Sequence, residues 1–396
     1  MDRRQFSRAF TAGALTAASY RRVMGANGRV GMVLIGSGRR GREVMKAHLD
    51  TDQVDLRVIC DIYAAQRDRA RTLLAPSGGK PYECTAHEEA LAQPGIDAVL
   101  IATPDHLHLD MAKAAFAAGK HVYLEKPATH HFEEGPQLLR AARLSGKVCQ
   151  IGTQQRSGAH YQQAREQIFA GGKLGKVVFV RAIWSNFPWQ ARRIQPAPKP
   201  PDLDWIRFLG HTPYMDYDAA RYDSWRYFPE YGGGVLADIL NHWADVAQWM
   251  MDDATPLNAV ATGGIYMLHD GRANPDSVNA IIQYSKDWNL SFESTVLPVQ
   301  NERPAVVFTG TEGTLDIARD GYIYTPHKGQ PVRVASSGSL ELAHAKNFLE
   351  CVRTGKTPNA DVAIGLQGVL PCHLAHAAYW SGRRMRYDAG THEIVG

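Results

Sequence analysis

The residue types and spacing that carry the clearest chemistry form a glycine-rich turn. The chain contains a G-x-G-x-x-G pattern made of Gly36, Ser37, Gly38, Arg39, Arg40 and Gly41. The apolar run Val30–Ile35 precedes it directly, and residues of helical composition follow it as far as Leu49. In this context the first glycine allows a tight turn, the second lets the backbone approach a pyrophosphate, and the third permits close helix–strand packing. Free N–H groups at the helix N-terminus favour phosphates, so the pattern predicts a dinucleotide site.

An acidic residue indicates which dinucleotide would bind. Asp61 follows the second apolar run, Asp55–Cys60, and lies about twenty residues beyond the last glycine of the turn. A carboxylate there can accept hydrogen bonds from both ribose hydroxyls, whereas a 2′-phosphate would meet its negative charge. Asp61 therefore favours NAD over NADP, and Arg39 and Arg40 partly offset that preference. The alternative interpretation is a glycine-rich turn that binds no nucleotide.

Two polar segments directly follow later apolar runs. After Ala98–Ala102 and His121–Leu124 come two sets of candidate cofactor ligands: Thr103, Pro104, His106 and His108, then Glu125, Lys126 and Pro127. The carboxyl ends of parallel strands meet at one edge of the sheet, where open α/β sheets bind ligands. His106 and His108 also form an H-x-H pair. No third ligand of suitable spacing lies nearby in the sequence, so we expect no metal site.

The order of the apolar runs predicts an α/β fold. Five runs, completed by Lys147–Ile151, alternate with helical stretches such as His106–Ala118 and Phe132–Leu144. This alternation is typical of a doubly wound parallel sheet, the Rossmann architecture, covered on both faces. Later in the chain, further strands are expected at Val177–Trp184, Asn258–Tyr266, Ser277–Tyr284, Leu290–Val296 and Val306–Thr309. The segment Leu340–Tyr379 is expected to form helices.

Together these segments resemble the Gfo/Idh/MocA oxidoreductases, the glucose–fructose oxidoreductase and inositol dehydrogenase family. The resemblance covers roughly residues 30–390, and the triplet Glu-Lys-Pro is its most specific mark. Asp238 and His242 follow a glycine run and look like the family's Asp-x-x-x-His helix, on which residues four apart share a face. Gln155 and Arg156 look like the family's entry into its second domain.

This resemblance implies a domain organisation. An NAD(P)-binding Rossmann domain is expected over residues 28–150. Residues 151–396 are expected to form a C-terminal α/β domain with an open, mostly antiparallel sheet that binds substrate. In the family such an open face commonly pairs subunits, so a homodimer or homotetramer is expected.

The resemblance also implies hydride transfer between a nicotinamide and a secondary hydroxyl of a sugar, glycoside or polyol. By this resemblance, Lys126 is expected against the reacting hydroxyl, and Asp238 is expected to orient His242 or to bind a neighbouring hydroxyl. Imidazole titrates near the working pH, which makes His242 the best candidate general base, but the sequence leaves Lys126 open for that role. Gln155 is expected at the cofactor and Arg156 at the substrate. The structural alternatives are an ordinary salt bridge for Lys126 and a packed core side chain for His242.

Two other functions compete with an ordinary dehydrogenase. One is a redox-neutral glycosidase or epimerase, in which a tightly held NAD oxidises a hydroxyl and later returns the hydride. The other is a catalytically silent nucleotide-binding relative, and the presence of Lys126, Asp238 and His242 argues against it.

A long aromatic segment separates the first expected strand of the second domain from the Asp-x-x-x-His helix. Residues 187–231 contain seven of the 21 prolines and three tryptophans, Trp189, Trp205 and Trp225. Long loops of this kind often form lids, and flat aromatic faces stack on sugar C–H surfaces. Trp189 and Trp225 are therefore candidate substrate contacts. The alternative is an arm used for packing or for oligomer contacts.

Composition limits the remaining functions. The 396 residues carry a net charge of +4, but residues 1–29 hold six arginines and one acid, which leaves −1 for the rest (+4 minus +5). Such a body does not suit nucleic-acid binding. The sequence contains no run of eighteen apolar residues, so we expect no membrane-spanning helix after the N-terminal segment. Residues 1–27 begin with Arg3-Arg4 and continue into a small apolar stretch, which resembles a twin-arginine export signal to the periplasm.

Overall fold

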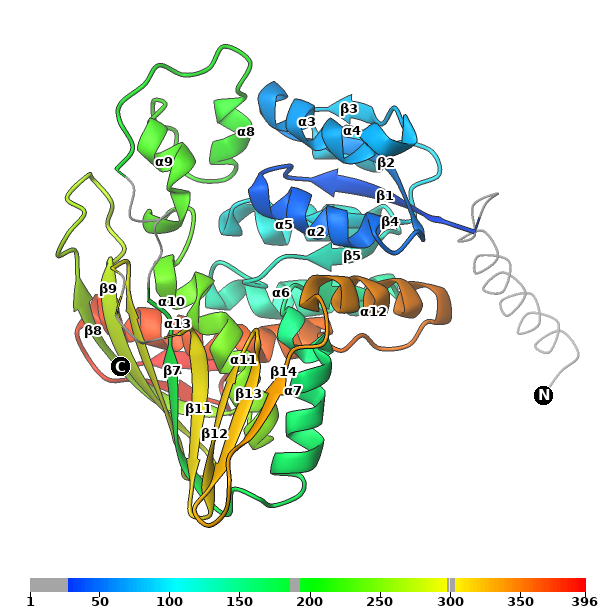
Figure 1. The fold of residues 1–396 in the computed structure, drawn as a ribbon. Helices are drawn as coiled ribbons and strands as arrows, with labels where there is room; N and C mark the ends of the chain where they lie inside the picture. The colour runs from blue at the N-terminus through cyan, green and yellow to red at the C-terminus, as the bar shows by residue number, and fades with distance from the viewer. Residues whose placement is uncertain (1–27, 186–192, 298, 300–302) are drawn as a thin grey trace, which may run out of the picture.

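The computed structural model describes residues 28–185, 193–297, 299 and 303–396. The expected export signal at 1–27 and the candidate residue Trp189 lie outside the described residues. Two sheets organise the molecule, one above the other in Figure 1, with a helical arm beside the upper one. No helix among the described residues is long and apolar enough to cross a membrane.

The first sheet is parallel and has six strands. In chain order these are β1 (Val30–Ile35), β2 (Val54–Cys60), β3 (Tyr82–Cys84), β4 (Ala98–Ile101), β5 (His121–Leu124) and β6 (Cys149–Ile151). Their order across the sheet is β3-β2-β1-β4-β5-β6, so the chain reverses direction of winding between β1 and β4. Every residue of β1, β4 and β5 is buried, as expected where helices cover both faces. The predicted Rossmann architecture is confirmed.

Five helices connect these strands. They are α2 (Arg39–Leu49), α3 (Ala64–Arg71), α4 (His87–Leu91), α5 (His108–Ala117) and α6 (Gly135–Ser145). The helix expected from His106 begins two residues later, because Asp105–Leu107 form a separate 3-10 turn. That turn aims the Asp105 side chain towards the carboxyl edge of the sheet.

The second sheet is mostly antiparallel and has ten strands. They are β7 (Val177–Ile183), β8 (Pro256–Gly264), β9 (Ser277–Tyr284), β10 (Asn289–Thr295), β11 (Ala305–Gly310), β12 (Gly313–Ala318), β13 (Gly321–Pro326), β14 (Val332–Ala335), β15 (Met385–Asp388) and β16 (Glu393–Val395). The spatial order is β14-β13-β12-β11-β7-β10-β9-β8-β15-β16, and the pair β7–β10 is parallel. The open, mostly antiparallel sheet is thus confirmed, but the five strands after β11 were not predicted.

One face of the second sheet packs against helices, and among the described residues the other face carries exposed side chains. The helices α11 (Leu240–Met251) and α13 (Val362–Ser381) share a buried cluster with the inward side chains of the strands. Along β9 the burial alternates, so that Ile281 on the outer face is about half exposed. Short helices α7 (Ala159–Ala164) and α10 (Gly234–Asp238) flank this layer.

The C-terminal part of the chain returns to the first sheet. Helix α12 (Leu340–Thr354) lies beside α2 in Figure 1. Phe348, Leu349 and Val352 of this helix belong to the same buried cluster as Val30 and Val44. The apolar side of α12 therefore completes the cover of the nucleotide-binding sheet, although α12 follows the second sheet in sequence.

The aromatic segment folds into an arm, defined here as residues 193–231. It contains α8 (Trp205–Leu209), α9 (Ala219–Asp223) and a 3-10 turn, Trp225–Tyr227. Figure 1 shows α8 beside α3, on the side of the first sheet. Its aromatic side chains form a small core that includes Ile62, and the Asp204 N–H donates to the Ile62 carbonyl over 3.0 Å. The arm is thus a packed structure that spans from the second sheet to the first.

Candidate active site

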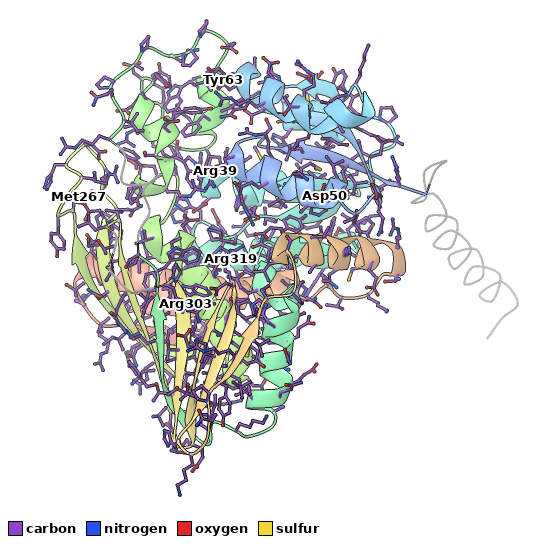
Figure 2. The ribbon with its side chains drawn as sticks, in the orientation of Figure 1. Arg39, Asp50, Tyr63, Met267, Arg303 and Arg319 are labelled. Atoms are coloured by element: carbon purple, nitrogen blue, oxygen red, sulfur yellow. The ribbon has the colours of Figure 1, made fainter. Side chains whose placement is uncertain are left out.

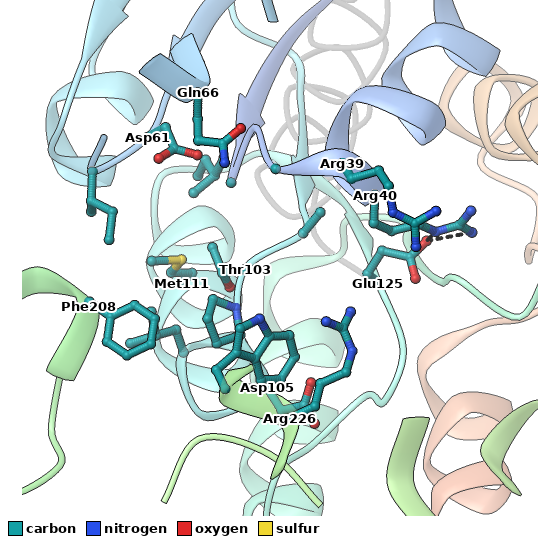
Figure 3. Close-up of a pocket in the computed structure, with 18 of the residues that line it drawn as sticks. Arg39, Arg40, Asp61, Gln66, Thr103, Asp105, Met111, Glu125, Phe208 and Arg226 are labelled. Carbon is teal, nitrogen blue, oxygen red and sulfur yellow. Dashed lines mark hydrogen bonds and ion pairs between the residues drawn. The ribbon is translucent and has the colours of Figure 1, made fainter. Parts of the chain in front are cut away.

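A cleft of about 960 Å³ opens at the carboxyl edge of the first sheet. Its walls come from the glycine turn, the ends of β2, β4 and β5, the arm, and the region of α10 and α11. Figure 3 shows Asp61 and Gln66 on one side, Arg40 and Glu125 on another, and Asp105 with Arg226 at a third. A cleft of this size can hold a dinucleotide cofactor or a large part of one with a small substrate.

The glycine turn has the shape that a pyrophosphate needs. Gly36 has φ +81°, and a Cβ there would lie 2.6 Å from the Ala102 carbonyl oxygen. A Cβ on Gly41 would lie 2.0 Å from the Gly36 oxygen, so only glycine lets α2 approach β1 this closely. A Cβ on Gly38 would meet no protein atom within 4 Å. The residues therefore fit a dinucleotide, because Gly38 leaves space just where the helix N-terminus presents its N–H groups.

Asp61 holds the glycine turn as well as lining the cleft. Its Oδ2 accepts hydrogen bonds from Ser37 N–H at 2.7 Å and from Ser37 Oγ at 3.0 Å. Its Oδ1 accepts from the Tyr63 N–H at 3.0 Å. Burial raises the pKa of Asp61, although these hydrogen bonds oppose the shift. Ser37 itself does not line the cleft among the described residues and contributes through Asp61.

Lys126 and Asp238 meet at the opposite end of the cleft. Lys126 Nζ donates to the Asp238 carboxylate Oδ1 and, over 2.7 Å, to the Asp238 backbone carbonyl. Arg226 Nε lies 3.2 Å from Asp238 Oδ2. Burial alone would raise the pKa of Asp238, but the cations of Lys126 and Arg226 hold it well below its ordinary value. Asp238 is therefore ionised, and each of its oxygens faces a different cation.

His242 lines the same end of the cleft from α11. Within the described part of the chain, its buried Nδ1 has no hydrogen-bond partner. Burial, helped by the nearby charge of Lys126, lowers the pKa of His242 well below its ordinary value, so the ring is neutral at pH 7. The Trp184 ring stands 6.0 Å from the imidazole, centroid to centroid. The ring is therefore in the unprotonated form that a general base requires.

A chain of ion pairs joins the two halves of the molecule beside this site. Arg40 lies 3.0 Å from Glu125 and 3.6 Å from Glu341, and Arg319 also pairs with Glu341 at 2.5 Å. Figure 2 shows Arg319 where the second sheet meets the first. These ion pairs connect α2, the end of β5, the turn after β12 and α12. They fix the wall of the cleft next to His242.

Two family models match this chain. Residues 30–153 match the oxidoreductase family with the NAD-binding Rossmann fold, and residues 161–316 match the GFO/IDH/MocA C-terminal domain. Together they cover most of the chain. The chain belongs to the Gfo/Idh/MocA family.

Individual relatives agree with this family. The scyllo-inositol 2-dehydrogenase (NAD(+)) of Bacillus subtilis is 27% identical over 287 residues, 70% of this chain and 75% of the relative. A glycosyl hydrolase family 109 protein of Stenotrophomonas maltophilia is 35% identical over 230 residues, 55% of this chain and 46% of the relative. Among solved structures, a levoglucosan dehydrogenase in complex with NADH and levoglucosan has a TM-score of 0.73 and 20% identity, and the match covers 90% of this chain and 99% of that one.

Most of the residues predicted for the site come together in this cleft. The predicted residues that line it are Gly36, Gly38, Arg39, Arg40, Asp61, Thr103, Pro104, Glu125, Lys126, Trp225, Asp238 and His242. Gly41 and Ser37 shape the turn from behind it. These residues come from the carboxyl edge of the first sheet, from the arm and from helices α10 and α11, so the site forms only when these parts of the chain have folded together.

The two histidines expected at the cofactor do not line the cleft. His106 Nε2 lies 2.8 Å from the Phe208 carbonyl, and its ring packs 5.1 Å from that of Tyr231. His108 Nδ1 lies 2.8 Å from the Pro127 carbonyl, and its Nε2 lies 3.2 Å from the Thr103 carbonyl. Neither ring is part of the cleft wall in this structure, and contact of either ring with a cofactor stays a prediction. His106 anchors the arm, and His108 ties together the two loops that follow β4 and β5.

Three further residues predicted for the site, Gln155, Pro127 and Arg156, do not line the cleft. Gln155 and Pro127 lie behind the lining residues, and Gln155 is fully buried. Arg156 Nε lies 2.8 and 2.9 Å from the two carboxylate oxygens of Asp245. Arg156 therefore forms a buried ion pair with α11, and its contact with substrate stays a prediction. Across the described ranges, no group of three or more His, Cys, Asp or Glu side chains is arranged to hold a metal ion.

The sequence prediction missed five cleft residues that bear on the chemistry. These are Asp105, Trp184, Arg226, Arg319 and Glu341. Asp105 lies within the segment after β4 that was singled out, and Arg226 directly follows Trp225, so both had a positional signal. Arg319 and Glu341 had none, because only the tertiary fold brings the turn after β12 and the start of α12 to α2.

Proposed function

We propose that this chain is an NAD-dependent oxidoreductase that transfers hydride between a secondary hydroxyl of a sugar, glycoside or polyol and the nicotinamide. The observation that carries the proposal is the meeting of Lys126, ionised Asp238 and neutral His242 at one end of a cleft whose other end is a dinucleotide-binding turn. Names of relatives support the substrate class, since one is an inositol dehydrogenase and one structural neighbour contains levoglucosan.

When bound, NAD supplies the hydride acceptor. The side chains of the protein orient the substrate and handle its hydroxyl proton. Lys126 Nζ, held by Asp238, donates a hydrogen bond to the substrate oxygen and stabilises the negative charge that grows there. His242, which lines the cleft with a neutral ring, accepts the hydroxyl proton. Trp184 and Trp225 offer flat faces to the C–H side of a sugar ring.

The test is NADH formation with a panel of cyclic polyols, aldoses and methyl glycosides. We expect at least one of these compounds to reduce NAD, and NADP to serve less well because of Asp61. Reduction of NAD by aldehydes only, with no alcohol as substrate, would contradict the proposed substrate class.

A second candidate is a redox-neutral reaction with a retained NAD, as a glycosidase or epimerase. The observation that favours it is the 35% identity with a glycosyl hydrolase family 109 protein. Purification without added nucleotide, followed by denaturation and mass spectrometry, separates the two candidates. About one NAD per chain supports the retained cofactor, whereas an empty protein that binds NAD reversibly supports the ordinary dehydrogenase.

We also propose that the protein is exported and that it is a homo-oligomer. The twin-arginine pattern Arg3-Arg4 and the apolar stretch after it support export, which would carry the folded enzyme to the periplasm. A double Arg3→Lys, Arg4→Lys variant should then stay in the cytoplasm.

The outer face of the second sheet supports an oligomer, since Phe179, Val260 and Ile281 are exposed on strands near its centre.

A further inference from the structure

Arg226 connects the arm to the proposed catalytic carboxylate. It belongs to the 3-10 turn Trp225–Tyr227, and its Nε lies 3.2 Å from Asp238 Oδ2. Lys126, which follows β5 in the first sheet, occupies Oδ1 of the same carboxylate. Two cations from distant parts of the chain thus hold the two oxygens of Asp238, and one of the two comes from the arm.

The backbone of Arg226 is fixed in place. Asn274 is fully buried, and its Nδ2 donates to the Arg226 carbonyl at 2.9 Å and to the Gly232 carbonyl at 2.8 Å. The backbone N–H of Asn274 donates to the Tyr227 carbonyl at 2.9 Å. The guanidinium carbon of Arg226 stands 4.3 Å from the centroid of the Trp225 ring. Both the backbone and the side chain of Arg226 are therefore preorganised at Asp238.

A second carboxyl group lies next to this pair. Figure 3 shows Asp105 and Arg226 side by side in the cleft. The Asp105 side chain is buried and accepts a hydrogen bond from the Gly233 N–H. Burial raises the pKa of Asp105 to about 8, although the charge of Arg226 opposes that shift. At neutral pH the cluster therefore contains two cations, Lys126 and Arg226, and one full negative charge, on Asp238.

We propose that Arg226 is the positioning residue that fixes Asp238 for the reaction and makes the arm part of the catalytic machinery. By holding Oδ2, Arg226 orients the carboxylate so that Oδ1 faces Lys126, and Lys126 in turn points at the substrate hydroxyl. The inference rests on the proposed roles of Lys126, Asp238 and His242. The inference adds Arg226 to these three residues, as the side chain through which the arm takes part in catalysis.

Loss of Arg226 should change both geometry and charge. Without it, Asp238 can rotate away from Lys126, and a displacement of about 1 Å at such a site can cost on the order of 100-fold in rate. The carboxylate also loses one of the cations that favour its ionised form, so its pKa should rise. The charged and titratable groups that face Asp238 are Lys126, His242, Asp105, Tyr227 and Arg226 itself. Of these, only Arg226 is changed in the experiment.

The experiment compares Arg226→Gln and Arg226→Lys with Arg221→Gln in the full-length protein. Arg221 is the matched control, because it belongs to the same arm, pairs with Glu230 at 3.1 Å, stacks on the Phe228 ring and does not line the cleft. For each variant, kcat, KM for NAD, and the pH dependence of kcat/KM are measured with an active compound from the panel, and bound NAD is quantified.

We expect Arg226→Gln to lower kcat about 100-fold, to leave KM for NAD unchanged and to move the acidic limb of the pH profile upward. Arg226→Lys should recover about tenfold of that loss by restoring the charge. Arg221→Gln should stay within about threefold of the wild-type kcat. A wild-type pH profile and kcat in Arg226→Gln would overturn the proposal, and so would an equal loss in Arg221→Gln, which would assign the effect to arm packing.

A comparison with Lys126→Ala separates this inference from the proposed function. If Lys126→Ala is inactive while Arg226→Gln behaves as the wild type, the inference about the arm fails and the proposed function stands. If Lys126→Ala retains full turnover, the proposed function itself fails.

Discussion

At the scale of single residues, the site combines ionisable groups whose environments push their pKa values in opposite directions. Asp238 stays ionised because two cations offset its burial, whereas Asp105 takes up a proton because burial dominates. His242 stays neutral because burial and the neighbouring cations both oppose its charge. Pairs of groups separated in this way are how active sites assign acid and base roles.

The pKa of His242 leads to the first prediction. Because that pKa lies well below its ordinary value, wild-type kcat/KM should show no inflection near about pH 6.5 due to this ring. His242→Asn removes the base and should lower kcat about 100- to 1,000-fold, by a similar factor throughout the neutral and alkaline range. The pH–rate profiles of both proteins check this. A wild-type acidic limb near pH 6.5 that the variant lacks would show that His242 has an ordinary pKa.

The pKa of Asp105 predicts how stability depends on pH. The folded-state pKa, about 8, is above the ordinary value of an aspartate, so the native protein binds a proton that the unfolded chain has released. The stability gained from this proton is complete below about pH 4 and is lost as the pH rises to about 8. Asp105→Asn should remove this dependence.

Free energies of unfolding, measured in urea at about pH 5 and about pH 8, test that prediction. The wild type should lose stability relative to Asp105→Asn between the two conditions. An unchanged difference between the two proteins would mean that Asp105 is ionised in the native state.

The sequence allowed Lys126, Asp238 and His242 to be predicted because they belong to short, ordered motifs. It did not reveal Arg226 or Arg319, whose roles depend on which distant segments meet. For His106 and His108, the motif predicted their position at the edge of the sheet but not the direction in which their side chains point. Neither ring lines the cleft, because His106 Nε2 bonds to a backbone carbonyl of the arm and both His108 nitrogens lie at backbone carbonyls of the neighbouring loops.

At the scale of elements, two glycines of the turn between β1 and α2 have different surroundings, one packed against the protein backbone and one open to a ligand. Gly41 faces backbone, and Gly38 faces open space. Gly41→Ala should destabilise the protein by about 1–3 kcal/mol, because α2 must move away from β1. Gly38→Ala should fold with nearly wild-type stability and bind NAD at least about tenfold more weakly.

Thermal unfolding and NAD titration of both variants check this pair of outcomes. Each variant is the control for the other, since both add a single methyl group to the same turn. If Gly38→Ala binds NAD as tightly as the wild type, the pyrophosphate does not lie against this glycine.

Long apolar strands and their helices could be predicted because their periodicity is a local property. Among the strands missed after β11, β14, β15 and β16 are short and mostly not buried, whereas β12 and β13 are as long as β11 and largely buried. In β14, for example, three of the four residues are exposed, so no apolar pattern marks it. Their pairing in the sheet comes from tertiary contacts, which the sequence pattern does not encode.

At the scale of the whole molecule, the second sheet has one uncovered face, and we expect it to pair with a second copy of the chain. Ile281 is about half exposed on β9, a strand inside this sheet. Ile281→Lys would place charges in the centre of such an interface and should convert the oligomer into monomers. Light scattering after size-exclusion chromatography measures this. A wild-type protein that is already monomeric would contradict the expected assembly.

In the proposed reaction, Lys126 acts on a substrate hydroxyl beside a bound NAD. The most direct measurement is NADH formation by the wild type and Lys126→Ala with the same polyol and glycoside panel, together with their bound NAD content. We expect equal NAD content in the two proteins and a turnover at least about 1,000-fold lower in the variant. Equal turnover would show that Lys126 does not act on the substrate hydroxyl.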